Sequence, residues 1–355
     1  MAYRKPQRHF SFADLAVEAL ADKNRALSVL KQLDATIDWN PIAQLLEQFY
    51  HTGKRNEGAK AYPPLLLFKC LMLQKWFQIP SDPELESQIN DRISFKSFLG
   101  LPMDQPAPDH STFSRFRGRL SKKAMVQLNS TLLSQFDRMG ITINEGIAVD
   151  ARLIKSASKP VSNDKLDELR QKHDSPEGRL DKNGKEKKFS RDLESDWTIK
   201  NDTPHFGLKE HAAVDVDNGF ILSTSITPAS HSDSTFLPYA TIYSMHSEQK
   251  IEVVYADKGY AGAPNRNFLS LNKIADGIMR KNNINAALTD VEIERNKSIS
   301  KKRYIVEQYF GLAALWDDRS RARFTTIVKN AIDAMFRQFA FNLRKGAGIL
   351  RRLPV

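Results

Sequence analysis

The spacing of apolar residues divides the chain into a helical first part and a second part of short strands. From residue 12 to 140, apolar side chains recur at steps of three and four residues, as in Leu15 to Leu33, Ile42 to Phe49 and Leu65 to Phe77. This is the period of a helix with one buried face. We therefore expect an almost entirely helical domain over residues 1–140.

Two capping sequences predict further helices in this first part. Ser81-Asp82-Pro83-Glu84 combines a capping side chain, a Pro suited to the first turn and a Glu three residues after Ser81. Asp109-His110-Ser111-Thr112 opens a short helix over Phe113 to Leu120. Short helices with an Arg-rich member are typical of a helix-turn-helix element, here at about residues 81–120. An ordinary helical domain with an exposed basic face is the alternative. The arginines of the short helix are Arg115, Arg117 and Arg119.

From Gly146 onward, short β-branched runs bounded by Gly, Asn and Asp predict strands. Asp217-Asn218-Gly219 predicts a hairpin turn between the second and third strands, because Asn and Gly accept a positive φ. Helices are expected at about 302–316 and 325–343. This order predicts an α/β domain with a mixed five-stranded sheet and flanking helices. The predicted strands are Gly146 to Asp150, Leu208 to Val216, Phe220 to Thr227, Ile251 to Ala256 and Ile274 to Met279.

A charged segment at about residues 155–200 interrupts the strand pattern. It holds twelve basic and ten acidic residues and few large apolar side chains, so it cannot form a core of its own. We interpret it as an insertion between the first two strands, partly helical near Asp164 to Lys172 and mobile around Asp181 to Lys188.

Composition narrows the class of protein. With 41% apolar and 27% charged residues, the 355-residue chain can bury a core, and the lone Cys70 excludes a disulfide framework and a multi-Cys zinc site. The longest apolar stretch, Pro63 to Leu73, is about half of a membrane span. The first ten residues lack the apolar region of a secretory signal. These features predict a cytoplasmic protein without a membrane partner.

The net charge of +11 favours a polyanionic partner, of which nucleic acid is the commonest. The charge is uneven: residues 295–355 hold fourteen Lys or Arg against four acids, a net of +10. Apolar residues at helical spacing run through the same region. We therefore interpret it as a folded basic surface beneath the active site rather than a basic tail.

Three acids lie where a metal site on a sheet would need them. Asp150 ends the strand Gly146 to Val149, Asp257 ends the strand Ile251 to Ala256, and Glu307 lies on a basic helix. Ligands of open α/β sheets bind at the carboxyl ends of strands. Carboxylate oxygens suit Mg²⁺, and two such ions can support phosphoryl transfer, with Asp150 and Asp257 as the shared ligands. Taken singly, each Asp could instead form a turn or cap a helix.

Blocks of sequence surround these acids in a fixed order. They are Val149 to Ala151, His205 to Asp215, Thr227 to Asp233, Ala256 to Tyr260, Arg303 to Glu307 with Phe310-Gly311, Arg323-Phe324 and Lys329-Asn330, preceded by Tyr62-Pro63 through Arg119. The series resembles bacterial insertion-sequence transposases with a DDE catalytic domain, and more narrowly the insertion-sequence-five group. The resemblance covers nearly the whole chain.

The resemblance implies a ribonuclease-H-like fold for residues 141–355, with the basic helical region at about 295–355 as its end. It implies the catalytic and metal-binding triad Asp150, Asp257 and Glu307, with two Mg²⁺ or Mn²⁺ ions per site. It also implies double-stranded DNA as the partner, both element ends and target, a dimer in the DNA complex, and association with the nucleoid. His231 and Asp233 are accessory candidates, although Ser232 and Asp233 alone predict a helix cap.

A further set of residues is expected to contact DNA. Lys209 and His211 alternate along the second strand, and one face of that strand approaches the first Asp; a solvated strand face is the alternative. Asp215 is interpreted as part of the turn. The predicted DNA contacts are Arg303, Lys258, Tyr260, Lys209, His211, Arg115, Arg117, Arg119, Arg319, Arg321 and Arg323.

The chain departs from the family pattern at two positions near the third acid. The pattern has a Tyr seven residues before the Glu, an Arg four before it and a basic residue seven after it. Arg303 matches, whereas Ser300 and Ala314 stand at the other two positions. Arg319, Arg321 or Arg323 is expected to replace the later basic residue. These departures keep two alternatives open: a decayed, sequence-specific DNA-binding protein and a nuclease of the same fold.

Overall fold

A computed structural model describes residues 19, 23–52, 60–142, 146–175, 178, 180, 184–185, 191–245, 251–282, 286–316 and 320–352. The chain divides into two compact units, one of Met1–Thr142 with Met335–Val355 and one of Ile143–Ala334. The prediction kept all of 141–355 in one domain, whereas the structure groups the last 21 residues with the N-terminal helices. Among the described helices, none has both the length and the apolar character needed to cross a bilayer.

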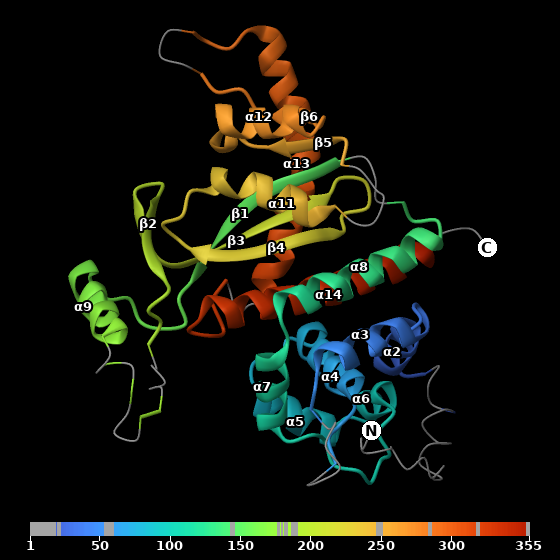
Figure 1. Cartoon of the computed structure of the whole chain (residues 1–355). Helices are drawn as coiled ribbons and strands as arrows, with labels where there is room; N and C mark the ends of the chain where they lie inside the picture. The colour runs from blue at the N-terminus through green and yellow to red at the C-terminus, as the bar shows by residue number, and fades with distance from the viewer. Residues whose placement is uncertain are drawn as a thin grey trace. The chain divides into compact units, whose positions relative to one another are not determined.

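The first unit is helical, as predicted (Figure 1). Ser81 caps α5 by accepting a hydrogen bond from the Glu84 amide at 3.2 Å, as its sequence predicts. Asp109 caps α7 through the Ser111 amide at 2.9 Å. The helices are α2 (Arg25–Ala35), α3 (Asn40–Phe49), α4 (Pro64–Trp76), α5 (Asp82–Asp91), α6 (Ile93–Leu99), α7 (His110–Arg119), α8 (Lys122–Arg138) and the later part of α14 (Ile327–Leu350).

The core of this unit forms around α4, which is apolar on all sides and almost wholly buried. The ring of Phe68 contacts the rings of Phe336 and Phe339 on α14, with centroids 5.2 and 5.0 Å apart. The indole Nε1 of Trp76 donates to the Ala340 carbonyl at 2.9 Å. Aromatic packing and a satisfied indole therefore tie the end of the chain to the N-terminal helices.

The second unit is built on a six-stranded sheet with the order β2-β3-β1-β5-β6, in which β4 also pairs with β3. Strand β1 pairs antiparallel with β3 and parallel with β5, and β5 pairs parallel with β6. All five predicted strands are present, but the predicted count is one short. The strands are β1 (Gly146–Lys155), β2 (Asp196–Lys200), β3 (Thr203–Asp215), β4 (Ile221–Pro228), β5 (Val253–Ala256) and β6 (Ala275–Ile278).

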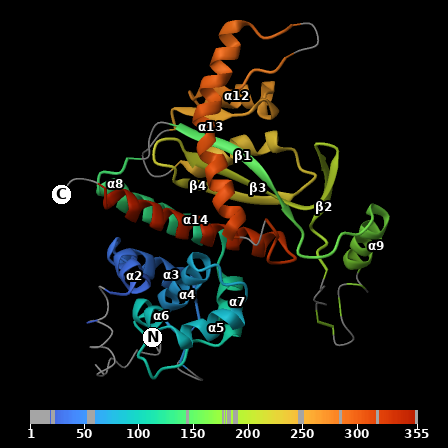
Figure 2. The ribbon, with the colours of Figure 1, turned by 180° about the vertical axis from the view of Figure 1, so that it is seen from behind.

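Helices cover both faces of this sheet. Helix α11 packs against β3 and β4 on one face, and α13 crosses the opposite face, where it packs against β1, β3 and β5. Figures 1 and 2 show these two faces in turn. The helical elements of this unit are α9 (Asn163–Asp174), the 3-10 turns η1 (Asp233–Phe236) and η2 (Lys258–Tyr260), α11 (Leu237–Ser244), α12 (Ala263–Leu271), α13 (Asp290–Trp316) and the start of α14.

The charged insertion is partly ordered. Its predicted helix is α9, and its last residues form β2 on the edge of the sheet. The buried Asp192 accepts hydrogen bonds from Ser156 Oγ at 2.7 Å and from the Ser195 amide at 2.8 Å. Side-chain hydrogen bonds therefore hold this segment, which has little apolar surface to bury. The stretch predicted to be mobile, 181–188, lies mostly outside the described residues.

Candidate active site

Strand register brings Asp150 and Asp257 to the same level of the sheet. Ala148 on β1 is level with Tyr255 on the parallel strand β5, so Asp150 is level with Asp257, which follows β5 directly. The prediction that Asp150 ends its strand is wrong, because β1 continues to Lys155. The carboxylate nevertheless lies where the neighbouring parallel strand ends, which is where such sheets place their ligands.

The Asp150 carboxylate is paired with Arg303 on α13. Arg303 Nη2 donates to Asp150 Oδ2 at 2.7 Å, and the Ala151 amide donates to Oδ1 at 2.8 Å. Burial raises the pKa of Asp150, and Asp257 and Asp233 raise it further, while Arg303 opposes them. Three carboxylates thus influence one another across a small region, and charge repulsion among them favours a bound cation.

Asp257 is fixed by the short turn that it begins. Its Oδ1 accepts a hydrogen bond from the Gly259 amide at 2.7 Å, as the cap of η2. A Cβ at Gly259 would lie 2.9 Å from the same oxygen, closer than side-chain carbons normally approach. Glycine at this position therefore lets the backbone amide hold the carboxylate in place. Lys258 is exposed beside it, so its predicted DNA contact stays a prediction.

Helix α13 carries Arg303 and, one turn later, Glu307. Arg303 is 8% exposed, whereas Glu307 is exposed. The helix is anchored to the sheet by a buried carboxylate on β3: Tyr309 Oη donates to Glu210 Oε1 at 2.6 Å, and Arg152 Nε donates to Glu210 Oε2 at 2.7 Å. This network fixes the turn of helix that presents Arg303 to Asp150. Ser300 is exposed, and Ala314 partly so, on the same helix.

The opposite face of β3 carries a second polar group. Lys209 Nζ lies 2.8 Å from Asp233 Oδ1, an ion pair without the angle of a hydrogen bond, and donates to the His231 carbonyl at 2.6 Å. His211 is 1% exposed, its Nε2 lies 2.9 Å from Thr227 Oγ1, and its ring stacks on Phe236. Burial lowers the pKa of His211 to about 4. Lys209 therefore positions η1, and His211 is a neutral, packed residue.

Several buried polar atoms around the acids have no hydrogen-bond partner among the residues that the structure describes. They include Tyr260 Oη, Arg303 Nε and His211 Nδ1, on residues that are at most 8% exposed. The pKa of Tyr260 is raised well above its usual value by burial first and then by Asp150, Asp233 and Asp257. Buried donors are rarely left without an acceptor. Such unsatisfied groups are typical of places where a water or a ligand binds.

The chemistry of these side chains fits a hard divalent cation, because the nearby ligands are carboxylate oxygens. The predicted triad is not closely assembled: it is not a group whose ligand atoms all lie within 4.8 Å of one another. In the described part of the chain that criterion is met by Glu86, Asp109 and His110.

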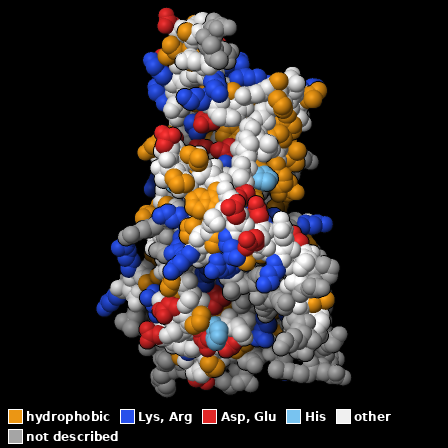
Figure 3. Space-filling model, turned by 90° about the vertical axis from the view of Figure 1, so that its left-hand side faces the viewer, with side chains coloured by type: hydrophobic (Ala, Val, Ile, Leu, Met, Phe, Trp, Pro, Cys, Tyr) orange, Lys and Arg blue, Asp and Glu red, His pale blue; other side chains and the backbone are white. Residues whose placement is uncertain are grey.

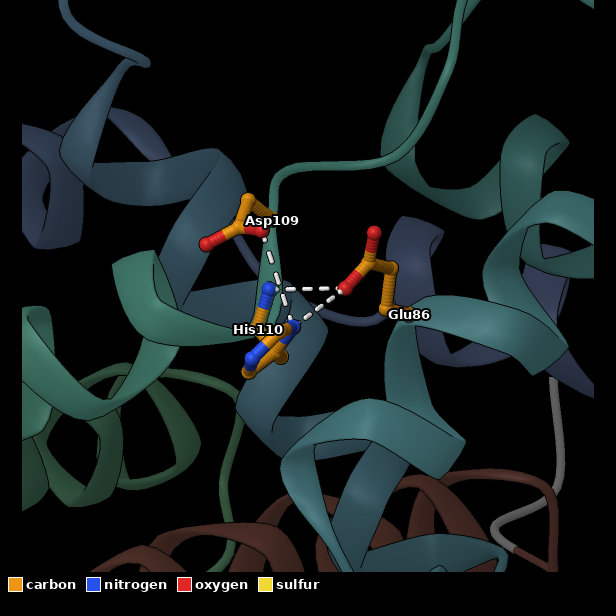
Figure 4. A group of neighbouring side chains, drawn as sticks. All are labelled: Glu86, Asp109 and His110. Atoms are coloured by element: carbon orange, nitrogen blue, oxygen red, sulfur yellow. Dashed lines mark hydrogen bonds and ion pairs between the residues drawn. The ribbon is translucent and has the colours of Figure 1, made fainter.

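The Glu86 group has a structural explanation (Figure 4). Asp109 caps α7, and Glu86 Oε2 accepts the His110 amide at 2.8 Å and lies 2.9 Å from His110 Nδ1. The Glu86 hydrogen bond is the main cause of the raised pKa of His110. These acids are thus already engaged with the start of a helix.

The arginines of α7 differ in their surroundings. Arg115 and Arg119 are exposed, in keeping with the predicted DNA contacts. Arg117 is 4% exposed and pairs with Asp82 on α5 at 2.9 Å. The prediction that Arg117 contacts DNA is therefore wrong, since its guanidinium holds α7 against α5. The prediction that His211 contacts DNA is wrong for a similar reason, because its side chain is buried and stacks on Phe236. Tyr260 is buried as well, close to the acids, and its predicted DNA contact stays a prediction.

The basic residues of the C-terminal region serve several purposes. Arg321 is exposed and donates to the Ala157 carbonyl at 3.3 Å, Arg323 is partly exposed, and Arg319 lies outside the described residues. Arg344 and Lys345 belong to the first unit. On the face shown in Figure 3, Lys and Arg side chains gather in several groups with acids between them. The predicted basic surface beneath the active site stays a prediction.

Sequence reasoning missed the residues that support the site. Glu210, Arg152 and Tyr309 form a buried network, yet a strand with charged residues at alternate positions indicated one solvated face. The signal that was available is the register: Arg152 is directly opposite Glu210 across the β1–β3 pair. Opposite charges facing each other on adjacent strands are a usual sign of pairing.

Comparison with protein families agrees with this arrangement. A family model described as a transposase DDE domain matches residues 143–343, more than half of the chain. A second model, described as a transposase domain (DUF772), matches residues 17–119. No solved structure matches the chain. Neither model distinguishes the insertion-sequence-five group, which stays a prediction.

These matches bear on the fold and on the chemistry. The DDE domain implies a ribonuclease-H-like fold, with which the mixed sheet agrees, and it supports an enzyme of the nuclease or transposase class that uses divalent metal. The acids on β1 and after β5 lie inside the matched region, beside buried groups that lack partners. The chain belongs to the family of transposases with a DDE catalytic domain.

Proposed function

We propose that this protein is a DNA transposase that binds the terminal inverted repeats of its own element. It hydrolyses a phosphodiester at each end and then joins the freed 3′-hydroxyl to target DNA. The observation that carries this proposal is the level placement of Asp150 and Asp257 beside buried, unpartnered donors, inside the matched DDE domain.

The residues divide this work between them. Asp150, Asp257 and Glu307 are the proposed ligands of two Mg²⁺ or Mn²⁺ ions, which would supply Lewis acidity and an activated nucleophile. Arg303 now neutralises Asp150, and its buried position beside the carboxylates suits it to hold a phosphate once a cation takes over that neutralisation. Lys209 keeps Asp233 and the η1 turn next to the acids.

The first unit is proposed to recognise the element ends. In α7, Arg115 and Arg119 are the exposed arginines, and α5 supports the helix through Asp82 and Arg117. Each phosphate contact would make the affinity fall with rising salt, since bound counterions are released. Because two ends must be joined, two copies of the chain are expected in the assembled complex, acting on DNA in the nucleoid of the cytoplasm.

The catalytic assignment is tested with duplexes taken from the ends of the element that flanks the coding sequence. Wild type with Mg²⁺ should nick the duplex at its end and join it to a second DNA, and Asp257→Ala should do neither. Asp217→Asn, which changes an exposed acid in the hairpin turn, serves as the matched control and should act like wild type. Equal activity of wild type and Asp257→Ala would overturn the assignment.

The same assay separates the two alternatives. A nuclease of this fold would hydrolyse the duplex and join nothing. A decayed DNA-binding protein would bind the ends with or without metal and leave them intact. Ser300 and Ala314, where the family pattern has a Tyr and a basic residue, are the reason to run the binding measurement beside the cleavage measurement.

A further inference from the structure

In the described part of the chain, the hydroxyl of Tyr260 has no hydrogen-bond partner, although several hydrogen bonds hold the backbone around it. The side chain is 2% exposed, and Oη makes no hydrogen bond. The backbone around it is fixed: the Tyr260 amide donates to the Asp257 carbonyl at 3.1 Å. Asn265 Nδ2 donates to the Tyr260 carbonyl at 2.9 Å and to the Ser234 carbonyl at 3.0 Å, which ties η2 to η1. The ring therefore has little freedom to turn its hydroxyl elsewhere.

An unpartnered hydroxyl in such a place is unfavourable for folding alone. Leaving a buried polar group without a hydrogen bond costs about 1–3 kcal/mol. Phenylalanine would fill the same space without that cost. The hydroxyl is therefore explained best by a partner that arrives with the substrate.

The side chains around Tyr260 indicate the chemical class of the ligand that its hydroxyl would bind. The hydroxyl is close enough to Asp150, Asp233 and Asp257 to interact with them electrostatically, and as a phenol it can donate a hydrogen bond to an incoming acceptor. Arg303 offers a second buried donor, its unpartnered Nε, to the same region. Two donors that lack an acceptor, beside carboxylates that would hold cations, suit an anion that binds together with those cations. A DNA phosphate has this chemistry.

We propose that Tyr260 is a substrate-contacting catalytic residue whose hydroxyl donates a hydrogen bond to a non-bridging oxygen of the scissile phosphate, with Arg303 as the second donor. This inference rests on the proposed transposase function and adds to it the group that recognises the reacting phosphate. In the hydrolytic step, the water oxygen bonds to phosphorus and the bond from phosphorus to the leaving 3′ oxygen breaks. The water loses a proton to solvent, the leaving oxygen gains one from solvent, and Tyr260 keeps its own.

A comparison of two tyrosines tests the inference without metal. Tyr260→Phe removes a hydroxyl that has no partner, so the urea unfolding midpoint of the metal-free protein should be unchanged or higher. Tyr309→Phe is the matched control, because the Tyr309 hydroxyl donates to Glu210 and the residue is equally buried. It should lower the midpoint. A loss of stability in Tyr260→Phe as large as that in Tyr309→Phe would make Tyr260 a structural residue and overturn the proposal.

Binding to DNA supplies the second readout. The probes are the end duplex and the same duplex with a neutral methylphosphonate at the scissile position, bound in Ca²⁺ under conditions where no cleavage is detected. Wild type should prefer the phosphodiester, and Tyr260→Phe should lose about tenfold or more of that preference, as expected for a hydrogen bond to a charged group. An unchanged preference would overturn the proposal.

Cleavage with Mg²⁺ completes the test and separates it from the proposed function. Loss of one donor to a developing charge should slow the nicking step of Tyr260→Phe by about 100-fold. If wild type cleaves and Tyr260→Phe cleaves as fast, the role of Tyr260 is wrong and the transposase assignment stands. If wild type neither cleaves nor distinguishes the two duplexes, both are wrong.

Discussion

Two groups of potential metal-binding side chains in this protein differ in what surrounds them. Glu86, Asp109 and His110 are close enough to hold a metal ion, with ligand atoms within 4.8 Å of one another. Asp150 and Asp257 do not form such a group with Glu307. The close group already binds the amides at the start of α7, whereas the looser group is surrounded by buried donors that lack acceptors.

Buried polar atoms without partners are therefore a better guide to a ligand site than the closeness of the acids. A carboxylate that caps a helix has its hydrogen bonds in the folded chain and gains little from an ion. A buried donor without an acceptor is unfavourable until a ligand arrives. Changes at Glu210, His211, Asp257 and Asp109 test this distinction between satisfied and unsatisfied groups.

Within the second unit, Glu210 contrasts with the unsatisfied groups at the candidate site, because this buried carboxylate is hydrogen-bonded to Arg152 and Tyr309. Glu210→Gln leaves the charge of Arg152 without its counter-ion, and breaking a buried pair in this way costs about 3–5 kcal/mol. Urea unfolding should show this loss. Glu194→Gln, which changes an exposed acid in the insertion, is the control and should lower the free energy of unfolding by less than Glu210→Gln does. A near-zero effect of Glu210→Gln would mean that the network does not hold α13 to the sheet.

The second prediction concerns His211, which lies beside the site and is held neutral. Its pKa falls from 6.5 to about 4 in the folded protein, so the unfolded chain binds a proton first as the pH is lowered. Stability is therefore fully present above pH 6.5 and is lost between about pH 6.5 and 4, by about 3 kcal/mol.

The test of this prediction compares wild type and His211→Asn by urea unfolding at pH 7 and pH 4. The variant should lose about 3 kcal/mol less on acidification. Asp215, whose pKa is raised to about 6, contributes with the opposite sign in both proteins and cancels in the comparison. Equal acid sensitivity of the two proteins would show that His211 is protonated in the fold.

The third prediction compares the two acid groups directly by Mn²⁺ binding. Asp257→Asn should weaken Mn²⁺ binding by about 100-fold or more, because even partners of metal ligands commonly contribute 10- to 100-fold. Asp109→Asn should leave the affinity unchanged. Isothermal titration calorimetry on the intact chain gives both values. If only Asp109→Asn lost Mn²⁺ binding, the Glu86 group would be the metal site, and Asp257 would not be a ligand.

The fold was largely predictable because most of its elements follow a simple period. The helices of the first unit and five strands show apolar spacing that matches their burial. Strand β2 was missed because its five residues are only partly buried and lie in a charged segment. Strand β1 was predicted too short because Arg152 interrupts the apolar run, and only its pairing with Glu210 lets it be buried.

The site was predictable in its acids and not in its surroundings. The family resemblance and the predicted strand ends indicated Asp150 and Asp257. The parallel register of β1 and β5 then places these two residues side by side. The burial of Arg117 and Tyr260 could not be inferred from spacing. Arg117 depends on a pairing with Asp82, 35 residues away, and Tyr260 on the packing of η2 against η1. Charged and aromatic side chains of this kind are exposed or buried according to partners that no local pattern contains.

The smallest expected effect belongs to Asp109, and it decides whether the Glu86 group is only a cap. Asp109→Ala removes the acceptor of the Ser111 amide and should lower the urea midpoint slightly, less than Glu210→Gln does. Asp109→Asn should restore the midpoint, because Asn caps helices about as well as Asp. Adding Mn²⁺ or Zn²⁺ should not raise the midpoint of Asp257→Asn, in which this group is intact. If the metal raises this midpoint, and adding Asp109→Ala removes the increase, the Glu86 group binds metal although its acids already have hydrogen-bond partners. The distinction between satisfied and unsatisfied acids would then be wrong.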